Sequence, residues 1–263
     1  MTPDATPLGR DLKPDSPGEN TELLPERAPL WMRQLVGDVR AGAMNEPLRR
    51  ALTPDTGIDR TRQASVLMLF AGAETSAELP NDAAVLLTHR SPRLRSHSGQ
   101  MAFPGGRRDP TDRNAVDCAL REAWEETGLD RHNVTPLAQL PEVHIRATGY
   151  PVHPILGHWH TPSPVGVVDP GEADAVASVP LAELLAPENR LTVARSGWSG
   201  PAFRLNGYII WGFTGGLLDA IIRQAGWERE WERHRHYDLV DTLAASRNNE
   251  AIREPLPERK PRT

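Results

Sequence analysis

Three glutamates within five residues, Glu122, Glu125 and Glu126, constrain the fold of this chain more than any other sequence feature. In a helix over residues 114–127, the spacing i, i+3 and i+4 puts all three carboxylates on one face. Like charges at this spacing repel, and only Arg121 is near enough in sequence to offset them. A merely solvated helix usually alternates acidic and basic residues, so the cluster indicates a bound cation. Oxygen ligands of this kind suit Mg²⁺ or Mn²⁺.

A glycine pair, Gly105 and Gly106, comes just before this acidic helix. It lies in a long stretch rich in Arg, Ser, Gly and Pro at residues 89–113, and long loops inside compact domains are usually functional or disordered. Glycine lets the backbone approach a metal or an anion without a Cβ in the way. Gly128 follows the predicted helix at the position where helices commonly end on glycine.

Residues 106–129 resemble the Nudix box, G-x5-E-x7-R-E-U-x-E-E-x-G-U, where U is bulky and apolar. The match runs from Arg121 to Leu129, with a small Ala123 at the first U position. Asp112 stands where the motif has glutamate, and one extra residue separates it from Arg121, which leaves the role of Asp112 open. The resemblance implies the Nudix fold, an α/β/α sandwich with a mixed central β-sheet, in the α/β (α+β) class.

The same resemblance implies metal-assisted hydrolysis of a diphosphate linked to another group. By motif position, Glu122 and Glu126 would be the main metal ligands, and Glu125 a further ligand or the general base. Arg121 would orient these carboxylates through charge-assisted hydrogen bonds. The predicted catalytic residues are therefore Glu125, Arg121 and Glu122, the predicted metal ligands are Glu122, Glu126 and Glu125, and the predicted cofactor is Mg²⁺ or Mn²⁺.

Residues 86–106 are similar to the signature of the coenzyme A diphosphatase subfamily of Nudix hydrolases, L-L-T-x-R-S-x3-R-x3-G-x3-F-P-G-G, and every fixed position is matched. This likeness implies coenzyme A or its thioesters as substrate, with 4′-phosphopantetheine and adenosine 3′,5′-bisphosphate as products. Coenzyme A carries a diphosphate and a 3′-phosphate, and arginine binds phosphate with two parallel hydrogen bonds. The predicted substrate-binding residues are Arg90, Arg95, Arg93, Gly105 and Gly106.

Two alternatives stay open at this point. The first is a Nudix hydrolase of another nucleoside diphosphate derivative, such as ADP-ribose, a dinucleotide or capped RNA. The second is a non-catalytic Nudix ligand sensor, although the complete glutamate cluster argues against lost catalysis. Glu172 lies in an acidic segment similar to one of the subfamily, and it either lies near the metal, acts as a base, or caps a turn.

Hydrophobic patterning places the remaining elements. Apart from the acidic helix at 114–127, it predicts helices at 30–39, 181–185 and 214–225 and strands at 64–70, 83–88, 136–139, 142–147, 153–159 and 207–213. The charged stretch 228–236 is expected to be a solvated helix face or part of an extension. The order of elements is mixed without strict βαβ alternation, which agrees with the class implied above.

Composition divides the chain into four expected parts. Six prolines among charged residues predict a disordered tail over residues 1–29, because such a segment buries too little apolar surface to offset its backbone entropy. A helix and linker follow at 30–59 and a Nudix domain at 60–226. A C-terminal extension, largely helical and then disordered, is expected at 227–263.

Charge and cysteine content narrow the expected setting. The net charge is −5, from 30 basic and 35 acidic residues, which disfavours a generally basic nucleic-acid binder. A single cysteine, Cys118, excludes an intramolecular disulfide. No apolar run approaches the roughly 18–20 residues that span a bilayer, and the N-terminus has no apolar signal region. We therefore expect a cytoplasmic protein with a small-molecule substrate and no nucleic-acid or membrane partner; a homodimer is left open.

Overall fold

The structure is a computed structural model, and it describes residues 21–44, 46, 63–94, 96–144 and 151–250. Its helices are α1 (Arg33–Ala41), α3 (Ala115–Thr127), α4 (Leu181–Leu185), α5 (Gly212–Gln224) and α6 (Leu239–Ala244), with short 3₁₀ turns at Pro25–Arg27, Leu30–Met32, Arg131–Asn133 and Pro187–Asn189. Its strands are β1 (Ala64–Ala71), β2 (Ala84–Arg90), β3 (Met101–Ala102), β4 (Gly105–Arg107), β5 (Val134–Gln139), β6 (Val143–His144), β7 (Pro151–Trp159), β8 (Ala173–Pro180), β9 (Arg190–Arg195), β10 (Trp198–Leu205), β11 (Tyr208–Ile210) and β12 (His236–Asp238).

The larger sheet has mixed strand directions. Its main order among the described residues is β3-β2-β1-β7-β5, and β4, β6 and β8 pair with β1, β7 and β2 respectively. β1 runs parallel to β7 from Ala64 to Phe70, whereas β2 and β4 run antiparallel to β1. β1 is apolar at nearly every position because both of its faces are buried, as expected for a central strand.

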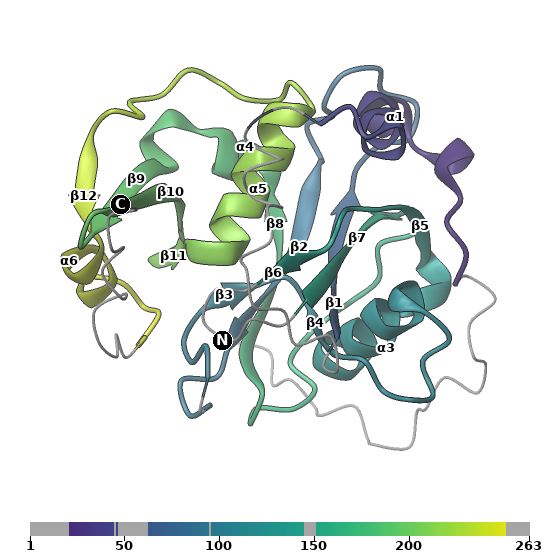
Figure 1. Cartoon of the computed structure of the whole chain (residues 1–263), viewed down its shortest axis with the longest axis horizontal. Coiled ribbons are helices and arrows are strands. Elements are labelled where there is room, and N and C mark those ends of the chain that lie inside the picture. Colours follow the sequence, from purple (N-terminus) through teal and green to yellow (C-terminus); the bar gives the residue numbers. More distant parts are fainter. Residues whose placement is uncertain (1–20, 45, 47–62, 95, 145–150, 251–263) are drawn as a thin grey trace, which may run out of the picture.

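Helices cover both faces of this sheet (Figure 1). On one face, Leu67 and Leu69 of β1 pack against the apolar side of α3. On the other face, Met68 and Phe70 pack in one cluster with residues of α1 and α5. The alternation along β1 therefore separates two hydrophobic layers, and it confirms the predicted α/β/α sandwich with a mixed central sheet.

A second sheet lies beyond α5, in the order β11-β10-β9-β12 among the described residues. α5 contributes to the same hydrophobic cluster as residues of both sheets, and so joins them. β12 comes from the expected C-terminal extension and pairs in parallel with β9. This extension is therefore integrated into the second sheet.

Most of the predicted elements are confirmed, with differences at their ends and in the second sheet. The helices expected at 114–127 and 181–185 correspond to α3 and α4. The strand expected at 207–213 is shorter, because α5 already begins at Gly212. β8, β9 and β10 were not predicted, and the loop over 89–113 contains the short β3 and β4. The strand expected at 142–147 lies partly outside the described residues.

Two expectations about the chain ends differ from the structure. Residues 21–29, expected to belong to a disordered tail, are packed: the Leu24 N–H donates to the Pro136 carbonyl at 2.8 Å, and Ala28 is buried. Residues 1–20 lie outside the described chain. The charged stretch 228–236 forms no helix; it contains turns and leads into β12, while Trp231 stacks on the buried Arg190 guanidinium. In the described part of the extension, helix is limited to α6.

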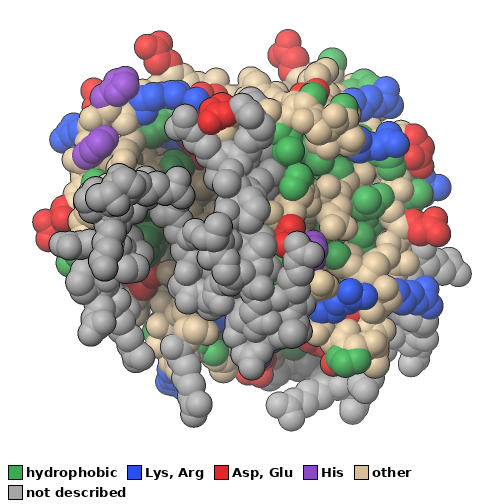
Figure 2. Space-filling model, in the orientation of Figure 1, with side chains coloured by type: hydrophobic (Ala, Val, Ile, Leu, Met, Phe, Trp, Pro, Cys, Tyr) green, Lys and Arg blue, Asp and Glu red, His purple; other side chains and the backbone are tan. Residues whose placement is uncertain are grey.

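The surface carries charges of both signs. On the described part of the face shown in Figure 2, acidic and basic side chains are interspersed. No helix among the described residues is long and apolar enough to cross a membrane.

Candidate active site

Helix α3 supplies the acidic residues of the site. It begins after Asn114, whose side-chain oxygen accepts the Asp117 N–H at 2.9 Å, and it ends at Gly128 in the left-handed conformation. Small and aliphatic residues along one side, including Ala119 and Ala123, pack against the sheet. The sequence thus fixes both ends of the helix and the apolar face that it packs against the sheet.

The three glutamates do not share one environment. The Glu126 side chain is 7% exposed and that of Glu122 is 16% exposed, whereas that of Glu125 is 44% exposed. The structure therefore brings Glu122 and Glu126 to the protein interior beside the glycine pair and leaves Glu125 at the rim. The expected common face of three carboxylates is present along the helix, but only two of them are enclosed.

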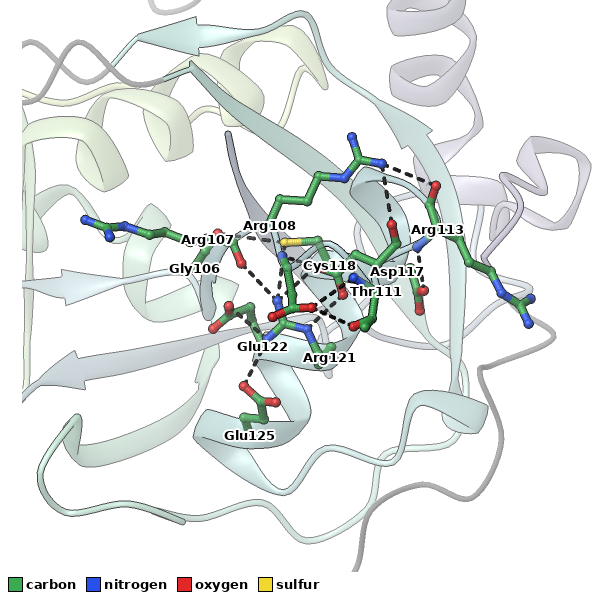
Figure 3. A network of polar contacts seen from close by, with 12 residues as sticks. Gly106, Arg107, Arg108, Thr111, Arg113, Asp117, Cys118, Arg121, Glu122 and Glu125 are labelled. Carbon is green, nitrogen blue, oxygen red and sulfur yellow. Dashed lines mark hydrogen bonds and ion pairs between the residues drawn. The ribbon is translucent and has the colours of Figure 1, made fainter. Parts of the chain in front are cut away.

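Arg121 contacts two of the glutamates, Glu122 and Glu125 (Figure 3), and is itself held by Asp112. Its Nε and Nη2 atoms donate to the two carboxylate oxygens of Asp112 at 2.8 and 2.9 Å. Its Nη1 atom lies 3.0 Å from Glu122 Oε1 and 3.0 Å from Glu125 Oε2. The geometry is that of a charge-assisted anchor, in which Asp112 fixes the arginine that orients the glutamates.

The structure gives Asp112 the role that the sequence left open, which is to hold Arg121. The Asp112 side chain is buried, and its Oδ2 atom also accepts the Asp109 N–H at 2.7 Å. Burial alone would raise the pKa of Asp112, but the hydrogen bonds from Arg121 and from the Asp109 backbone lower it below its ordinary value. The extra residue before Arg121 is thus accommodated in the loop without loss of the acid–arginine pair.

The glycine pair of β4 closes over these carboxylates. The Gly105 N–H donates to Glu126 Oε2 at 3.1 Å. A Cβ on Gly106 would overlap the carboxylate of Glu122, so only glycine fits there with Glu122 in this position. The predicted Gly105 and Gly106 are therefore beside the acidic residues, where their backbone lines the site.

Burial raises the cost of ionising both Glu122 and Glu126. Burial raises the pKa of Glu122 to about 7, against the opposing effect of Arg121. Burial also raises the pKa of Glu126 to about 7, and the charge of Arg90 and the hydrogen bond from the Gly105 N–H only partly oppose this. The negative charge of Glu172 raises the pKa of both groups. Such a site lacks positive charge, which a divalent cation would supply.

Glu172 enters the site from the turn before β8. Its carbonyl accepts the Ser91 N–H at 2.9 Å, which ties this turn to the end of β2. Its side chain is exposed, yet its charge acts on both Glu122 and Glu126. The acidic segment at 169–176 was the sequence signal for this residue, but only the pairing of β8 with β2 brings it beside α3.

Of the predicted arginines, Arg90 borders this centre. We call residues 91–100, which connect β2 to β3, the arginine loop. Arg90, the last residue of β2 directly before this loop, has its Nη1 atom 3.7 Å from Glu126 Oε1. That distance exceeds hydrogen-bond length, so this Nη1 can turn to a ligand anion. Arg93 is exposed in the loop, and Arg95 lies outside the described residues.

The donor set fits a hard divalent cation, although it is not a preformed cage. Among the described residues, no group of three or more His, Cys, Asp or Glu side chains is arranged to hold a metal ion. Arg121 accounts for this in part, because it engages Glu122 and Glu125 in ion pairs. Glu122 and Glu126 nevertheless offer buried carboxylate oxygens without sufficient counter-charge, which suits Mg²⁺ or Mn²⁺. Cys118 is buried nearby, and burial raises the pKa of its thiol to about 12, so it is a poor metal ligand at neutral pH.

Comparisons with known proteins identify the family. The NUDIX domain family model matches residues 52–196, more than half of the 263 residues. The chain is 38% identical over 146 residues to the uncharacterized Nudix hydrolase NudL of Escherichia coli K12, a match that covers 54% of this chain and 75% of that protein. It is 36% identical over 152 residues to the NudL protein of Klebsiella pneumoniae strain 342, with the same coverage of each chain.

Solved Nudix structures are also similar to parts of the chain. RenU, a Nudix hydrolase from M. smegmatis, is 26% identical, with a TM-score of 0.37 over 46% of this chain and 72% of its own. The NUDIX domain of Shewanella oneidensis NrtR is 19% identical, with a TM-score of 0.38 over 54% of this chain and 87% of its own. These TM-scores are too low to assign a family, so the family assignment rests on the family model and on the identity to the NudL proteins. The chain belongs to the Nudix hydrolase family.

Proposed function

We propose that this Nudix hydrolase cleaves the diphosphate of coenzyme A or its thioesters, giving 4′-phosphopantetheine and adenosine 3′,5′-bisphosphate. The sequence of the arginine loop and its flanks supports this substrate, because it matches the coenzyme A diphosphatase signature at every fixed position. A substrate with a diphosphate and a further phosphate calls for several cationic groups near the metal-binding carboxylates. Arg90, Arg93 and Arg95 are the candidates for that role.

The position of Arg90 is the main structural support for this substrate. Its guanidinium lies 3.7 Å from the Glu126 carboxylate, so the first arginine of the signature borders the proposed metal site. A diphosphate bridging the metal and Arg90 would be neutralised from two sides. The backbone of Gly105 and Gly106 packs closely beside the metal-binding carboxylates, with no room for a Cβ at either position, and so helps to hold them in place.

We assign metal binding to Glu122 and Glu126, with Glu125 as a ligand at the rim. A bound Mg²⁺ or Mn²⁺ would supply charge neutralisation of the diphosphate and a water of lowered pKa. Arg121, anchored by Asp112, keeps Glu122 and Glu125 oriented. For the proton acceptor we favour Glu172 over Glu125, because Glu125 already accepts a hydrogen bond from Arg121, whereas the charge of Glu172 acts on both Glu122 and Glu126.

The experiment compares coenzyme A, 3′-dephospho-coenzyme A and ADP-ribose as substrates, with Mn²⁺ or Mg²⁺ and mass detection of both products. We expect the highest kcat/KM for coenzyme A, and loss of turnover in Glu122→Gln. A Glu172→Gln variant should lose more kcat than Glu125→Gln if Glu172 accepts the proton. Charge reversal in Arg90→Glu should raise KM for coenzyme A and for ADP-ribose alike, because both carry the diphosphate that Arg90 is proposed to bind.

Other outcomes would point to the alternatives. Preference for the compounds without the 3′-phosphate would favour a hydrolase of another nucleoside diphosphate derivative. If the wild type binds coenzyme A but releases no product with either metal, and Glu122→Gln binds equally well, the protein is a ligand sensor.

A further inference from the structure

The C-terminal extension returns to the arginine loop from outside the stretch that matches the family model, which ends at residue 196. We call residues 246–250 the clasp. Asn248 anchors the clasp on β11: its side-chain oxygen accepts the Ile209 N–H at 2.8 Å and its side-chain nitrogen donates to the Ile209 carbonyl at 3.0 Å. Asn248 is fully buried, so these two bonds fix the clasp on β11, which is the edge strand of the second sheet among the described residues.

Glu250 extends from the clasp to the arginine loop. Its Oε2 atom accepts the Trp211 indole N–H at 2.9 Å, and its Oε1 atom accepts a hydrogen bond from Gln100 Nε2 at 2.6 Å. Gln100 is the last residue of the arginine loop, and its carbonyl accepts the Arg90 N–H at 2.9 Å. One carboxylate thus connects the start of α5 to the closing residue of the loop.

The backbones of the loop and the clasp meet at Gly99. Gly99 has a φ of 74°, and a Cβ on it would overlap the carbonyl of Asn248. Its N–H donates to the Arg90 carbonyl at 3.0 Å, which closes the loop beside Arg90. A side chain at this position would therefore strain the backbone and push the clasp away.

His89 joins the loop, the clasp and β8. It is buried; its Nδ1 contacts the Asp174 carboxylate, and its Nε2 lies 3.0 Å from the Gly99 carbonyl and 3.1 Å from the Asn248 carbonyl. The two ring nitrogens thus face oxygen atoms of β8, of the loop and of the clasp. His89 stands at a variable position of the loop signature, yet it connects Arg90 to the turn that carries Glu172.

We propose that the clasp is a positioning element of the substrate site, in which Glu250 and His89 hold the arginine loop so that Arg90 stays beside Glu126. This inference rests on the proposed function in one respect, which is that the arginine loop binds the phosphates of the substrate. Glu250 and His89 are positioning residues, since neither of them contacts Glu122 or Glu126 in the described structure.

The test uses the full chain with Glu250→Ala, which removes both hydrogen bonds of the carboxylate, and with Glu230→Ala as the control. Glu230 is an exposed carboxylate of the same extension, outside the clasp. In Glu250→Ala, we expect amide hydrogen exchange of residues 91–100 to rise about tenfold, because a lost charge-assisted bond opens the loop more often. KM for coenzyme A should rise about tenfold while kcat changes less than about twofold. Glu230→Ala should match the wild type.

Two further variants keep the inference testable if Glu250→Ala folds poorly. Gln100→Ala breaks the same contact from the loop side and should reproduce the faster exchange and the raised KM. Glu250→Gln keeps the length of the side chain and, with the Gln100 amide turned over, both hydrogen bonds, so it should restore most of the wild-type exchange and KM.

Unchanged exchange of residues 91–100 in folded Glu250→Ala and in Gln100→Ala would overturn the inference. So would a fall in kcat with KM unchanged, because that pattern places the effect on the chemical step. If the wild type fails to hydrolyse coenzyme A, the proposed function fails. The exchange comparison still decides whether the clasp holds the loop.

Discussion

At the residue scale, the Asp112–Arg121 pair is the support on which the acidic cluster depends. Asp112→Asn removes the charge that faces Arg121, leaving a half-buried guanidinium without its main partner. We expect a loss of about 2–3 kcal/mol in the free energy of unfolding at pH 7 and at least about a tenfold fall in kcat/KM. Urea unfolding and steady-state kinetics measure both.

The control for this prediction lies three residues earlier. Asp109→Asn keeps an oxygen for the Thr111 N–H at an exposed position, so its stability and activity should stay close to those of the wild type. Because the pKa of Asp112 is lowered, the stabilisation by the pair is present above the unfolded-state pKa of about 3.9 and is lost as pH falls further. Equal effects of the two substitutions at pH 7 would contradict the assigned role.

Ionised Asp112 stabilises the fold, whereas ionised Glu126 destabilises the metal-free protein. The pKa of Glu126 is raised to about 7, so the folded state binds this proton more tightly than the unfolded state. Its contribution therefore becomes unfavourable as pH rises from about 4.5 through 7. In EDTA at pH 8, Glu126→Gln should be more stable than the wild type by about 1–3 kcal/mol, and this difference should vanish near pH 4.

Thermal unfolding at the two pH values, with and without Mn²⁺, tests this prediction. Mn²⁺ should raise the Tm of the wild type far more than that of Glu126→Gln, because only the wild type offers the buried carboxylate to the metal. A metal-free Glu126→Gln variant less stable than the wild type at pH 8 would show that the carboxylate stabilises the fold by itself.

At the element scale, β4 and α3 form one unit, because the backbone of Gly106 packs against the side chain of Glu122. Gly106→Ala puts a Cβ where the Glu122 carboxylate lies, so the carboxylate must move. We expect at least about a tenfold fall in kcat and weaker Mn²⁺ binding. Gly216→Ala is the matched control: it lies in α5 with no atom near the added Cβ, and should leave activity unchanged and stability equal or up to about 1 kcal/mol higher. Full activity in Gly106→Ala would show that Glu122 does not need this position.

Elements with a strong local pattern could be predicted from the sequence, and those defined by distant partners could not. The acidic face of α3 follows from helical spacing, and Gly128 marks its end. Asp112 was left open because one extra residue shifts it within the motif, and only the folded loop shows its bond to Arg121. Glu172 was singled out by its acidic segment, but its position relative to Glu122 depends on the pairing of distant strands. The role of Glu250 depends on a contact with Gln100, far away in the chain, for which a local pattern carries no signal.

At the scale of the whole molecule, an aromatic cluster joins the N-terminal segment to the central sheet and the C-terminal extension. Trp31 lies 5.2 Å from Trp227 between ring centroids, and Trp227 lies 6.0 Å from Phe70 of β1. Trp31→Ala should lower the free energy of unfolding by about 3–5 kcal/mol, because it removes a large buried side chain. Leu30→Ala, at a 39% exposed neighbour, should cost far less. Equal losses in urea unfolding would show that the segment is not part of the core.

The central claim is that Glu122 and Glu126 form a divalent-cation site at which a diphosphate is hydrolysed. Titration of Mn²⁺ into the full chain, followed by electron paramagnetic resonance in the presence and absence of coenzyme A, tests it most directly. We predict saturable binding in the wild type, tightened by coenzyme A, and loss of that binding in Glu122→Gln and Glu126→Gln. Mn²⁺ binding that is absent from the wild type, or unchanged in both variants, would contradict the account.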